Sequence, residues 1–271
     1  MKKSGMLLAS VIGLTMIVTA CGSKENNGNN ASGGDTKVYK FATDAAYAPM
    51  ESMDKDEIVG FDVDFLAAVM EEAGLKYELK NIGWETLLVS VEQGTEFDGG
   101  ISAMSITDDR KKVYDFSPAY FESTNMIIVK EDSPVASALD LKDKKVAVQT
   151  GTTADTLMTE IMGEGNTDLR RFETNTLALM ELANNGVDAV VADIAVAQEY
   201  LKNNPDSKFK TLLDRENFAS EYYGIAFPKG SELAVKLEPA VKKVLESDKY
   251  KEIYAKWIGG EPDMTGVLNQ K

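Results

Sequence analysis

The stretch of residues 75–103, LKYELKNIGWETLLVSVEQGTEFDGGISA, decides the fold of this chain. Leu75–Asn81 is predicted to be a β-strand, and Asp98–Ala103 is predicted to be the next one. Between them, apolar residues recur at i, i+3, i+4 and i+7, the spacing of one helix face: Trp84, Leu87, Leu88 and Val91. Gly94 then ends the helix. A strand, a helix and a second strand with short connections predict an α/β fold with parallel strands.

The same alternation continues on both sides of this stretch. Upstream, Val38–Thr43 is predicted to be a strand, and the helix that follows it ends at Gly74. Downstream, the pattern restarts with four predicted strands: Lys145–Gln149, Leu169–Phe172, Val187–Asp193 and Phe209–Leu213. Five helices are predicted around and after them: about 151–163, Thr174–Asn184, Ile194–Lys202, Glu232–Glu246 and Lys249–Trp257. Two occurrences of one motif indicate two lobes.

The first 36 residues have the features of a secretion signal followed by a linker. Two lysines precede an apolar run that ends at Ala20, which is the layout of a signal peptide over residues 1–20. The small residue before Cys21 resembles a bacterial lipobox, in which the cysteine is lipidated. A plain signal peptide with an incidental cysteine is the alternative. Residues 21–36, rich in Gly, Asn and Ser, are predicted to be a flexible tether behind that lipidated cysteine.

The composition excludes several classes of protein. The 271 residues carry 29 Lys and Arg against 44 Asp and Glu, and a formal net charge of −15 argues against nucleic-acid binding. With no His, the chain has no Ser-His-Asp triad or HExxH zinc site, and its single Cys excludes an internal disulfide. Asp54–Glu57 misses the spacing of an EF-hand loop, and Gly151–Thr153 lacks the lysine of a phosphate-binding loop. We therefore expect neither a metal ion nor a cofactor.

Polar residues lie at the predicted carboxyl ends of the strands, where open α/β sheets bind their ligands. Asp44 follows the first strand, and Ser102–Ser105 follow the third. Gln149–Thr153 follow the first strand of the second set, and Asp193 ends another strand of that set. Arg110 lies one or two helical turns beyond the serines. Groups of both signs that converge in this way suit a zwitterionic ligand.

Each charged group of a zwitterion has a candidate partner among these residues. A carboxylate favours a planar bidentate donor such as Arg110, and the free N–H groups of a helix start, which Thr152–Thr153 offers. An ammonium group favours a carboxylate together with neutral oxygens, which Asp193 and a nearby serine supply. The aromatic rings of Tyr47 and Trp84 could pack against the apolar part of a ligand side chain or stack on a cationic group at its end.

The same residues also have structural interpretations. Arg110 stands in a charged run that is typical of a solvated helix face. Asp193 fits the N-cap of the next helix equally well, and Trp84 fits the apolar face of a helix in the core. Asp44 suits a turn, and Thr152 suits a helix cap. None of these motifs is decisive alone.

Taken in order, the motifs resemble those of the solute-binding proteins of ABC importers for polar amino acids. Seven segments carry the resemblance and span nearly all of the chain after the tether: ATDAAYAPMES (42–52), GFDVDFLAAV (60–69), ISAMSITDDRKKVYDFSPAYF (101–121), VAVQTGTT (146–153), VDAVVAD (187–193), YYGIAFPKGS (222–231) and EIYAKWIG (252–259). Within this family, the chain most resembles the arginine-, lysine- and histidine-binding lipoproteins of Gram-positive bacteria. NIGWETL at 81–87 and NFASEYYG at 217–224 contribute most to this narrower resemblance.

The resemblance implies a two-lobed α/β fold of the periplasmic-binding-protein type II class, in which two hinge crossovers join the lobes. The crossovers are expected near residues 120–124 and 219–223. The first lobe is then discontinuous, at 37–119 plus 224–271, and the second lobe covers 125–218. The ligand is expected to be enclosed as the lobes close.

The resemblance also implies a role for each candidate residue. It assigns Arg110 to the ligand carboxylate, with help from the backbone amides of Ser105 and Thr153. It assigns Asp193, together with Ser102, to the α-ammonium group. The residues that it assigns to the side-chain pocket are Asp44, Tyr47, Trp84 and, opposite them, Gln149.

Two residues depart from the family pattern. Ala103 stands where relatives carry Gly or Ser, which removes a hydroxyl group and narrows the pocket. Gln149 stands where glutamine-binding relatives carry Lys. A neutral residue does not repel a cationic ligand, so arginine or lysine is favoured over glutamine or glutamate. Glu51 is a further candidate for the far end of a long cationic side chain.

The function that follows is capture rather than catalysis. We expect an extracellular monomer, anchored to the membrane by its N-terminal lipid, that binds a free basic amino acid and delivers it to the permease of an ABC importer. Binding of glutamine or another polar amino acid is one alternative, and a ligand-sensing lipoprotein without an importer is another. A dehydratase on the same fold is a remote alternative, because only Asp or Glu is available as a proton donor.

Overall fold

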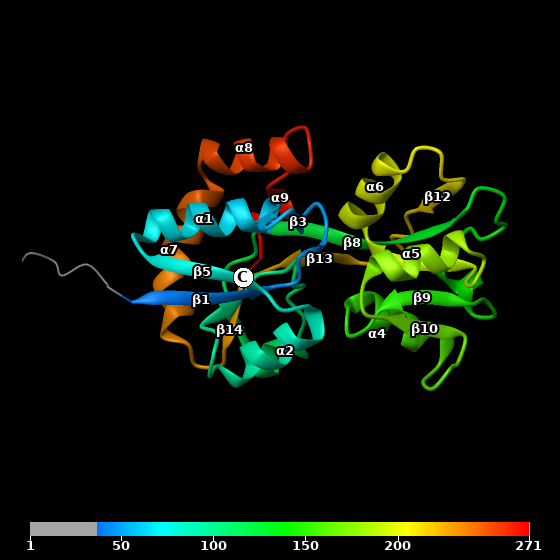
Figure 1. Ribbon diagram of the computed structural model, residues 1–271, viewed down its shortest axis with the longest axis horizontal. Coiled ribbons are helices and arrows are strands. Elements are labelled where there is room, and N and C mark those ends of the chain that lie inside the picture. Colours follow the sequence, from blue (N-terminus) through cyan, green and yellow to red (C-terminus); the bar gives the residue numbers. More distant parts are fainter. Residues whose placement is uncertain (1–36, 271) are drawn as a thin grey trace, which may run out of the picture. The chain divides into compact units, whose positions relative to one another are not determined.

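The computed structural model describes residues 37–270 of the chain, and Figure 1 shows how their elements are arranged. The predicted signal peptide, the lipidated Cys21 and the tether lie outside the described residues. Within the described part, no helix is both long enough and apolar enough to span a bilayer.

Five strands form the first sheet, in the order β5-β1-β6-β14-β7. Their bounds are Val38–Thr43 (β1), Lys76–Asn81 (β5), Gly99–Gly100 (β6), Tyr114–Phe116 (β7) and Ala226–Pro228 (β14). β1 pairs in parallel with β5 and with β6, as the strand-helix-strand pattern predicts. β14 pairs antiparallel with β6 and β7, so the sheet is mixed rather than parallel throughout.

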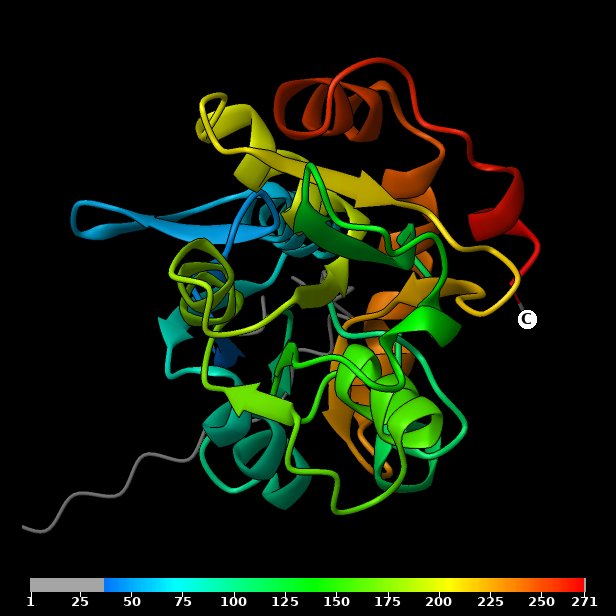
Figure 2. The same cartoon turned by 90° about the vertical axis from the view of Figure 1, so that its right-hand side faces the viewer.

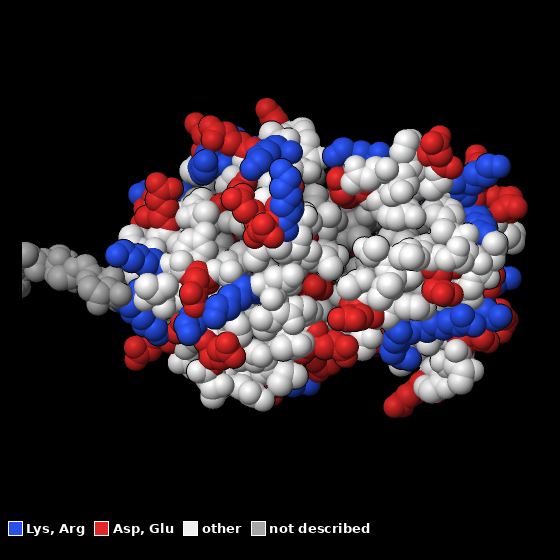
Figure 3. Space-filling view, viewed as in Figure 1, with Lys and Arg blue, Asp and Glu red and all other residues white. Residues whose placement is uncertain are grey.

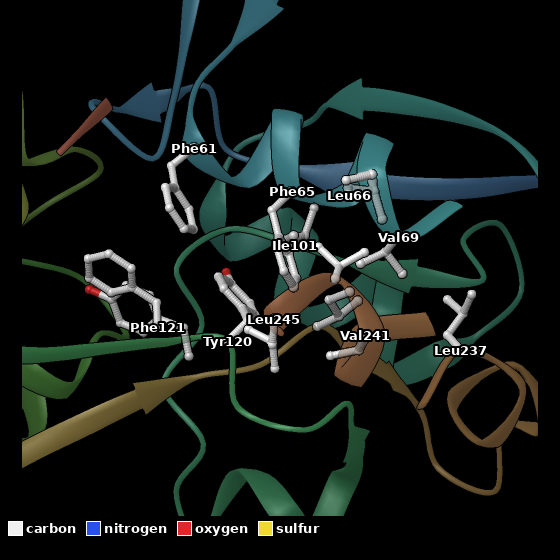
Figure 4. Close-up of a cluster of buried hydrophobic side chains, with 14 of the residues drawn as sticks. Phe61, Phe65, Leu66, Val69, Ile101, Tyr120, Phe121, Leu237, Val241 and Leu245 are labelled. Carbon is white, nitrogen blue, oxygen red and sulfur yellow. The ribbon is translucent and has the colours of Figure 1, made fainter. Parts of the chain in front are cut away.

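Helices cover both faces of the first sheet (Figure 1). The helices are α1 (Phe61–Ala73), α7 (Glu232–Leu245) and α8 (Asp248–Trp257) on one face, and α2 (Trp84–Gln93) on the other. Because successive side chains of a strand point to opposite faces, Phe41 of β1 packs in the cluster of α1 and α7, whereas Ala42 packs in the cluster of α2. Figure 4 shows the first cluster, in which Phe65 stacks on Tyr120 with ring centroids 4.6 Å apart.

The second sheet also has five strands in line, in the order β10-β9-β11-β8-β12. Their bounds are Phe121–Lys130 (β8), Val146–Gln149 (β9), Leu169–Phe172 (β10), Ala189–Asp193 (β11) and Phe209–Leu212 (β12). β9 is parallel to β10 and β11, whereas β8 is antiparallel to β11 and β12. The surrounding elements are η1 (Ala138–Leu141), α4 (Thr153–Met162), α5 (Asn175–Ala183) and α6 (Ile194–Asn203). Ile127 packs towards α4 and Ile128 towards α5, so this sheet is also buried on both faces.

Two extended segments connect the sheets. β8 and β13 (Ser220–Tyr223) pair antiparallel with each other, with Tyr223 opposite Phe121. They contain residues 121–124 and 220–223 of the segments predicted as crossovers, and β8 continues into the second sheet. We call the elements around the first sheet the first lobe and those around the second sheet the second lobe. The predicted limits of the lobes and the hinge role of the crossovers stay predictions.

A third, small sheet was not predicted from the sequence. It consists of β2 (Ala46–Tyr47), β3 (Glu51–Asp54) and β4 (Glu57–Val59), paired antiparallel in the order β2-β3-β4. Figure 2 shows the hairpin of β3 and β4 projecting away from the helices. At its base, Gly60 has φ 149°, and a Cβ atom there would lie 2.0 Å from the carbonyl oxygen of Met50. Only glycine lets the hairpin return this closely to the start of α1.

The predicted strand Asp98–Ala103 is wrong in length, because only Gly99–Gly100 pairs as β6. The chain approaches its neighbours so closely here that a Cβ atom on Gly99 would lie 2.8 Å from the ring of Phe41. It then turns out of the sheet, and Ala103 adopts a left-handed φ of 45°. Two short helices also escaped prediction: α3 (Arg110–Val113) and α9 (Thr265–Leu268).

Candidate ligand-binding site

The carboxyl ends of the strands of both lobes meet at one cavity. Of the eleven predicted site residues, nine line this cavity: Tyr47, Trp84, Ser102, Ala103, Ser105, Arg110, Thr152, Thr153 and Asp193. The remaining two contact each other beside it, since Gln149 Nε2 donates a hydrogen bond to Asp44 Oδ2 at 3.1 Å. The structure therefore brings the predicted residues together, and their roles towards a ligand stay predictions.

Arg110 is fixed between the two lobes. Its Nη1 donates to the carbonyl oxygen of Ser105 in the first lobe at 3.0 Å, and its Nη2 donates to that of Gly151 in the second at 3.2 Å. The guanidinium lies over the ring of Trp84, 5.3 Å from the centroid. The neighbouring Lys112 pairs instead with Asp109, and both side chains are exposed. The charged run is thus a solvated surface except at Arg110, which turns inward.

Asp193 ends β11 and stands at the N-cap position of α6, but its side chain does not cap that helix. Its Oδ2 instead accepts hydrogen bonds from the hydroxyl groups of Tyr47, at 2.8 Å, and of Tyr223. Burial raises the pKa of Asp193 to about 7, and the negative charge of Glu221 adds to this effect. Both tyrosines thus bind the same carboxylate oxygen of a residue that lines the cavity.

Tyr223 is a functional residue that the sequence analysis missed. It lies in the crossover strand β13, is fully buried, and is hydrogen-bonded to both Asp193 and, at 2.8 Å, Ser123. The signal was present in the segment YYGIAFPKGS, which we used only for its resemblance. Tyr223 holds Asp193 at the boundary between the crossovers and the second lobe.

Asp44 does not line the cavity and adjoins it through Ser102, which does. Its backbone N–H donates to Ser102 Oγ at 3.2 Å, and its carboxylate accepts from Gln149. Gln149 is oriented in turn by Asn175, whose Nδ2 donates to Gln149 Oε1 at 3.0 Å. Burial raises the pKa of Asp44, and the hydrogen bond from Gln149 opposes that effect. Asn175, at the start of α5, is a second residue that the sequence analysis missed.

A pair of buried carboxyl groups lies behind the serine loop. Ser102 Oγ donates to Glu51 Oε1, and Asp62 Oδ2 accepts from the backbone N–H of Ala103 at 2.7 Å. Burial raises the pKa of Glu51 well above its ordinary value and that of Asp62 to about 6. Glu51 is fully buried and does not line the cavity, so it supports Ser102 rather than facing a ligand.

The structural interpretations of the remaining residues also hold in part. Trp84 packs in the α2 cluster and lines the cavity at the same time. Thr152 caps α4 by accepting from the backbone N–H of Asp155 at 3.3 Å, and it also lines the cavity. Ala103 adopts a left-handed φ of 45°, a conformation that glycine adopts without strain. Residues 37–270 contain no group of three or more acidic or cysteine side chains placed to hold a metal ion.

Fold and site together define a two-lobed α/β binding protein. The chain belongs to the bacterial extracellular solute-binding proteins, family 3, whose sequence profile matches residues 39–260. It is similar to the arginine-, lysine-, histidine-binding protein ArtJ of Geobacillus stearothermophilus, with 53% identity, a TM-score of 0.83, and coverage of 86% of this chain and 100% of that one.

Two further relatives differ in the ligand that they are named for. The probable histidine-binding protein of Neisseria gonorrhoeae is 40% identical over 249 residues, which cover 91% of this chain and 92% of the relative. The ABC transporter glutamine-binding protein GlnH of Bacillus subtilis (strain 168) is 30% identical over 278 residues, covering 97% and 99%. The predicted family and fold class are confirmed.

Proposed function

We propose that this protein captures an L-amino acid with a cationic side chain outside the cell, as the solute-binding component of an ABC importer. The observation that carries the proposal is that Arg110 of the first lobe and Asp193 of the second line one cavity. A guanidinium suits the α-carboxylate and a carboxylate suits the α-ammonium, so the two residues match the part that all amino acids share.

Capture follows from the cost of burying these charges. Closing the lobes removes Arg110 and Asp193 from water, which costs several kcal/mol per ion unless each ion gains partners. A zwitterion supplies both counter-charges at once, so it favours the closed form over the open one. The closed form then delivers the amino acid to the permease.

The preference for a basic side chain rests on Asp44. Its carboxylate lies beside the cavity with only a neutral amide, that of Gln149, as its polar side-chain partner. The relative ArtJ is named for arginine, lysine and histidine. Acidic and basic side chains are interspersed over the face seen in Figure 3, and the net charge of −15 attracts a cationic solute.

Glutamine is a second candidate ligand. The amide of Gln149 already binds Asp44, which shows that this carboxylate accepts a neutral amide donor at 3.1 Å. The relative GlnH is named for glutamine. A ligand amide that replaced Gln149 as the donor would satisfy the same carboxylate oxygen.

Thermal-shift measurements against the twenty amino acids test the proposal. A ligand that binds only the folded state at a hundredfold excess over its Kd stabilises the protein by about 2.7 kcal/mol. We expect the largest rise in melting temperature for arginine, lysine or histidine. The largest rise for glutamine would support the second candidate, and no rise for any amino acid would contradict both.

Catalysis is not part of the proposal, since the relatives are named as binding proteins. Chromatography of the ligand after long incubation should recover it unchanged, and a dehydrated product would overturn this point. Light scattering should find a monomer.

The proposed membrane attachment depends on lipidation of Cys21. In the native host, the Cys21→Ser variant should move from the membrane fraction to the medium, and immunoblotting of both fractions measures this. An unchanged membrane fraction would contradict lipid anchoring.

A further inference from the structure

Glu221 of the crossover strand β13 joins both sides of the cavity, and nothing in the sequence analysis singled it out. Its Oε2 accepts hydrogen bonds from Ser105 Oγ at 2.6 Å and from Thr153 Oγ1 at 2.8 Å. Its Oε1 accepts from Asn125 Nδ2 at 2.6 Å. Glu221 accepts the hydrogen bond in all three contacts, which is the only role open to a carboxylate.

The three donors come from three parts of the fold. Ser105 follows β6 of the first lobe, Thr153 begins α4 of the second lobe, and Asn125 lies on the other crossover strand, β8. Asn125 Nδ2 also lies 3.2 Å from Thr153 Oγ1, which closes the network. One carboxylate therefore fixes the two residues whose amides the family resemblance assigns to the ligand carboxylate.

Glu221 also acts on Arg110 through its charge. Burial lowers the pKa of Arg110, and the negative charge of Glu221 opposes that effect more strongly than the charge of Asp193 does. Geometry links the two residues as well, because Ser105 donates its hydroxyl hydrogen to Glu221 and accepts from Arg110 Nη1 at its carbonyl oxygen. A ligand carboxylate that approaches Arg110 meets a cation that is already partly neutralised.

We infer that Glu221 is a positioning and selectivity residue, which provides the counter-charge of Arg110 and sets how strongly binding depends on the ligand α-carboxylate. The inference rests on the proposed function, because it takes an amino acid as the ligand. Two properties of Glu221 act in the same direction. Its charge weakens the attraction of Arg110 for a second carboxylate, and its oxygen atoms take the hydroxyl hydrogens of Ser105 and Thr153.

The variant Glu221→Gln separates charge from position. The amide oxygen can replace Oε1 and accept from Asn125, while the amide NH2 can replace Oε2 and donate to both hydroxyl oxygens. The geometry is then retained, the charge is lost, and the hydroxyl hydrogens of Ser105 and Thr153 become free to bind a carboxylate. The variant should therefore discriminate more strongly than the wild type in favour of ligands that carry an α-carboxylate.

Isothermal titration calorimetry with L-arginine and L-argininamide measures this discrimination. Argininamide keeps the guanidinium and the α-ammonium but replaces the carboxylate with a neutral amide. We expect the ratio of the two dissociation constants, argininamide over arginine, to rise at least fivefold in Glu221→Gln. The exposed Glu216→Gln variant removes the same charge from the surface and should leave the ratio unchanged.

A purely structural role for Glu221 predicts a different result. Loss of local order weakens the contacts of the carboxylate-binding segments, so the ratio would stay the same or fall, and either outcome overturns the inference. Wild-type protein that binds neither compound would instead contradict the choice of ligand in the proposed function. The two failures are therefore distinguishable.

Thr153→Val provides a second test that leaves Glu221 in place. Because the hydroxyl hydrogen of Thr153 is directed to Glu221, its removal should change the ratio by less than twofold. A large fall in the ratio would show that this hydroxyl binds the ligand carboxylate directly, which contradicts the orientation that we infer.

Discussion

The two ends of the candidate site, one that lines the cavity and one that adjoins it, differ in how they hold their charges. At one end, Arg110 and Asp193 are fixed by strong partners, which are backbone carbonyl groups and two tyrosine hydroxyl groups. At the other end, Asp44 is held by the amide of Gln149, which depends on Asn175 in turn. We call these the α-group end and the side-chain end.

The difference predicts where affinity and selectivity arise. Under the proposed function, the α-group end offers ions of both signs to the two charged groups that all amino acids share. The side-chain end carries one carboxylate with neutral partners, so the ligand charge decides how well that carboxylate is compensated. Substitutions at the first end should therefore weaken all ligands, and substitutions at the second should change their ranking.

The largest effect is expected at the α-group end. Arg110→Ala removes the partner of the ligand carboxylate, and the loss of one member of a buried charge pair costs at least about 2 kcal/mol, or about thirtyfold in affinity. Titration calorimetry with arginine and with glutamine should show similar losses for both. Lys112→Ala, which removes an exposed charge nearby, is the matched control. Affinity close to that of the wild type would remove Arg110 from the site.

At the side-chain end, Asp44→Asn should change selectivity. The variant keeps the shape of the side chain but loses its charge, and charge-assisted hydrogen bonds are about twice as strong as neutral ones. We expect arginine to lose about tenfold in affinity and glutamine less than threefold. Asp56→Asn at the exposed hairpin tip controls for net charge. Equal losses for both ligands would show that Asp44 does not distinguish their side chains.

Acidification tests the α-group end again, through Asp193. Its pKa is raised to about 7 by burial, whereas a bound ammonium favours the ionised form and so lowers this pKa. The affinity should therefore rise as the pH approaches 7 and level off above it. We expect the dissociation constant of arginine to be about tenfold higher near pH 5.5 than near pH 8, where calorimetry can measure both.

One variant serves as the control for the other titratable groups near Asp193. Tyr47, Tyr223, Glu221 and Arg110 all act on its charge, and burial raises the pKa of Asp62, behind the serine loop, to about 6. Asp193→Asn should bind arginine weakly and show no dependence on pH in this range. A dependence that persists in this variant would belong to another group and would contradict the assignment to Asp193.

The sequence predicted those elements whose bounds are determined by local patterns of apolar and turn-forming residues. The bounds of β1 and β10 were predicted to the residue: β1 is a largely apolar run that ends shortly before a turn, and β10 lies between a turn and a bend. The strands β3 and β4 were missed because β3 is largely polar, β4 has only three residues, and the hairpin forms where Gly60 allows the chain to approach Met50. Such an approach is a tertiary contact that no short-range pattern expresses.

The same distinction applies to the site. Asp193 became a candidate because it ends a predicted strand, and Arg110 because it follows the serines and suits a ligand carboxylate; both roles stay predictions. Tyr223, Glu221 and Asn175 act on these residues or on Gln149 through space, over separations such as the 30 residues between Asp193 and Tyr223. Their functions depend on the crossovers and on α5, which bring distant segments together, so residue type alone did not reveal them.

The smallest effect is expected for Asn175→Ala, which tests the orientation of the side-chain end. Asn175 is buried and its Nδ2 donates to Gln149 Oε1, so the amide of Gln149 must present its Nε2 to Asp44. Without this donor, Gln149 can rotate and direct its oxygen at the carboxylate, which costs about 1 kcal/mol or less and lowers arginine affinity about threefold. Calorimetry should show this loss for arginine, whereas exposed Thr176→Ala on the same helix should change nothing. If Asn175→Ala weakened arginine as much as Asp44→Asn does, Asn175 would itself contact the ligand, and the side-chain end would contain two recognition groups instead of one.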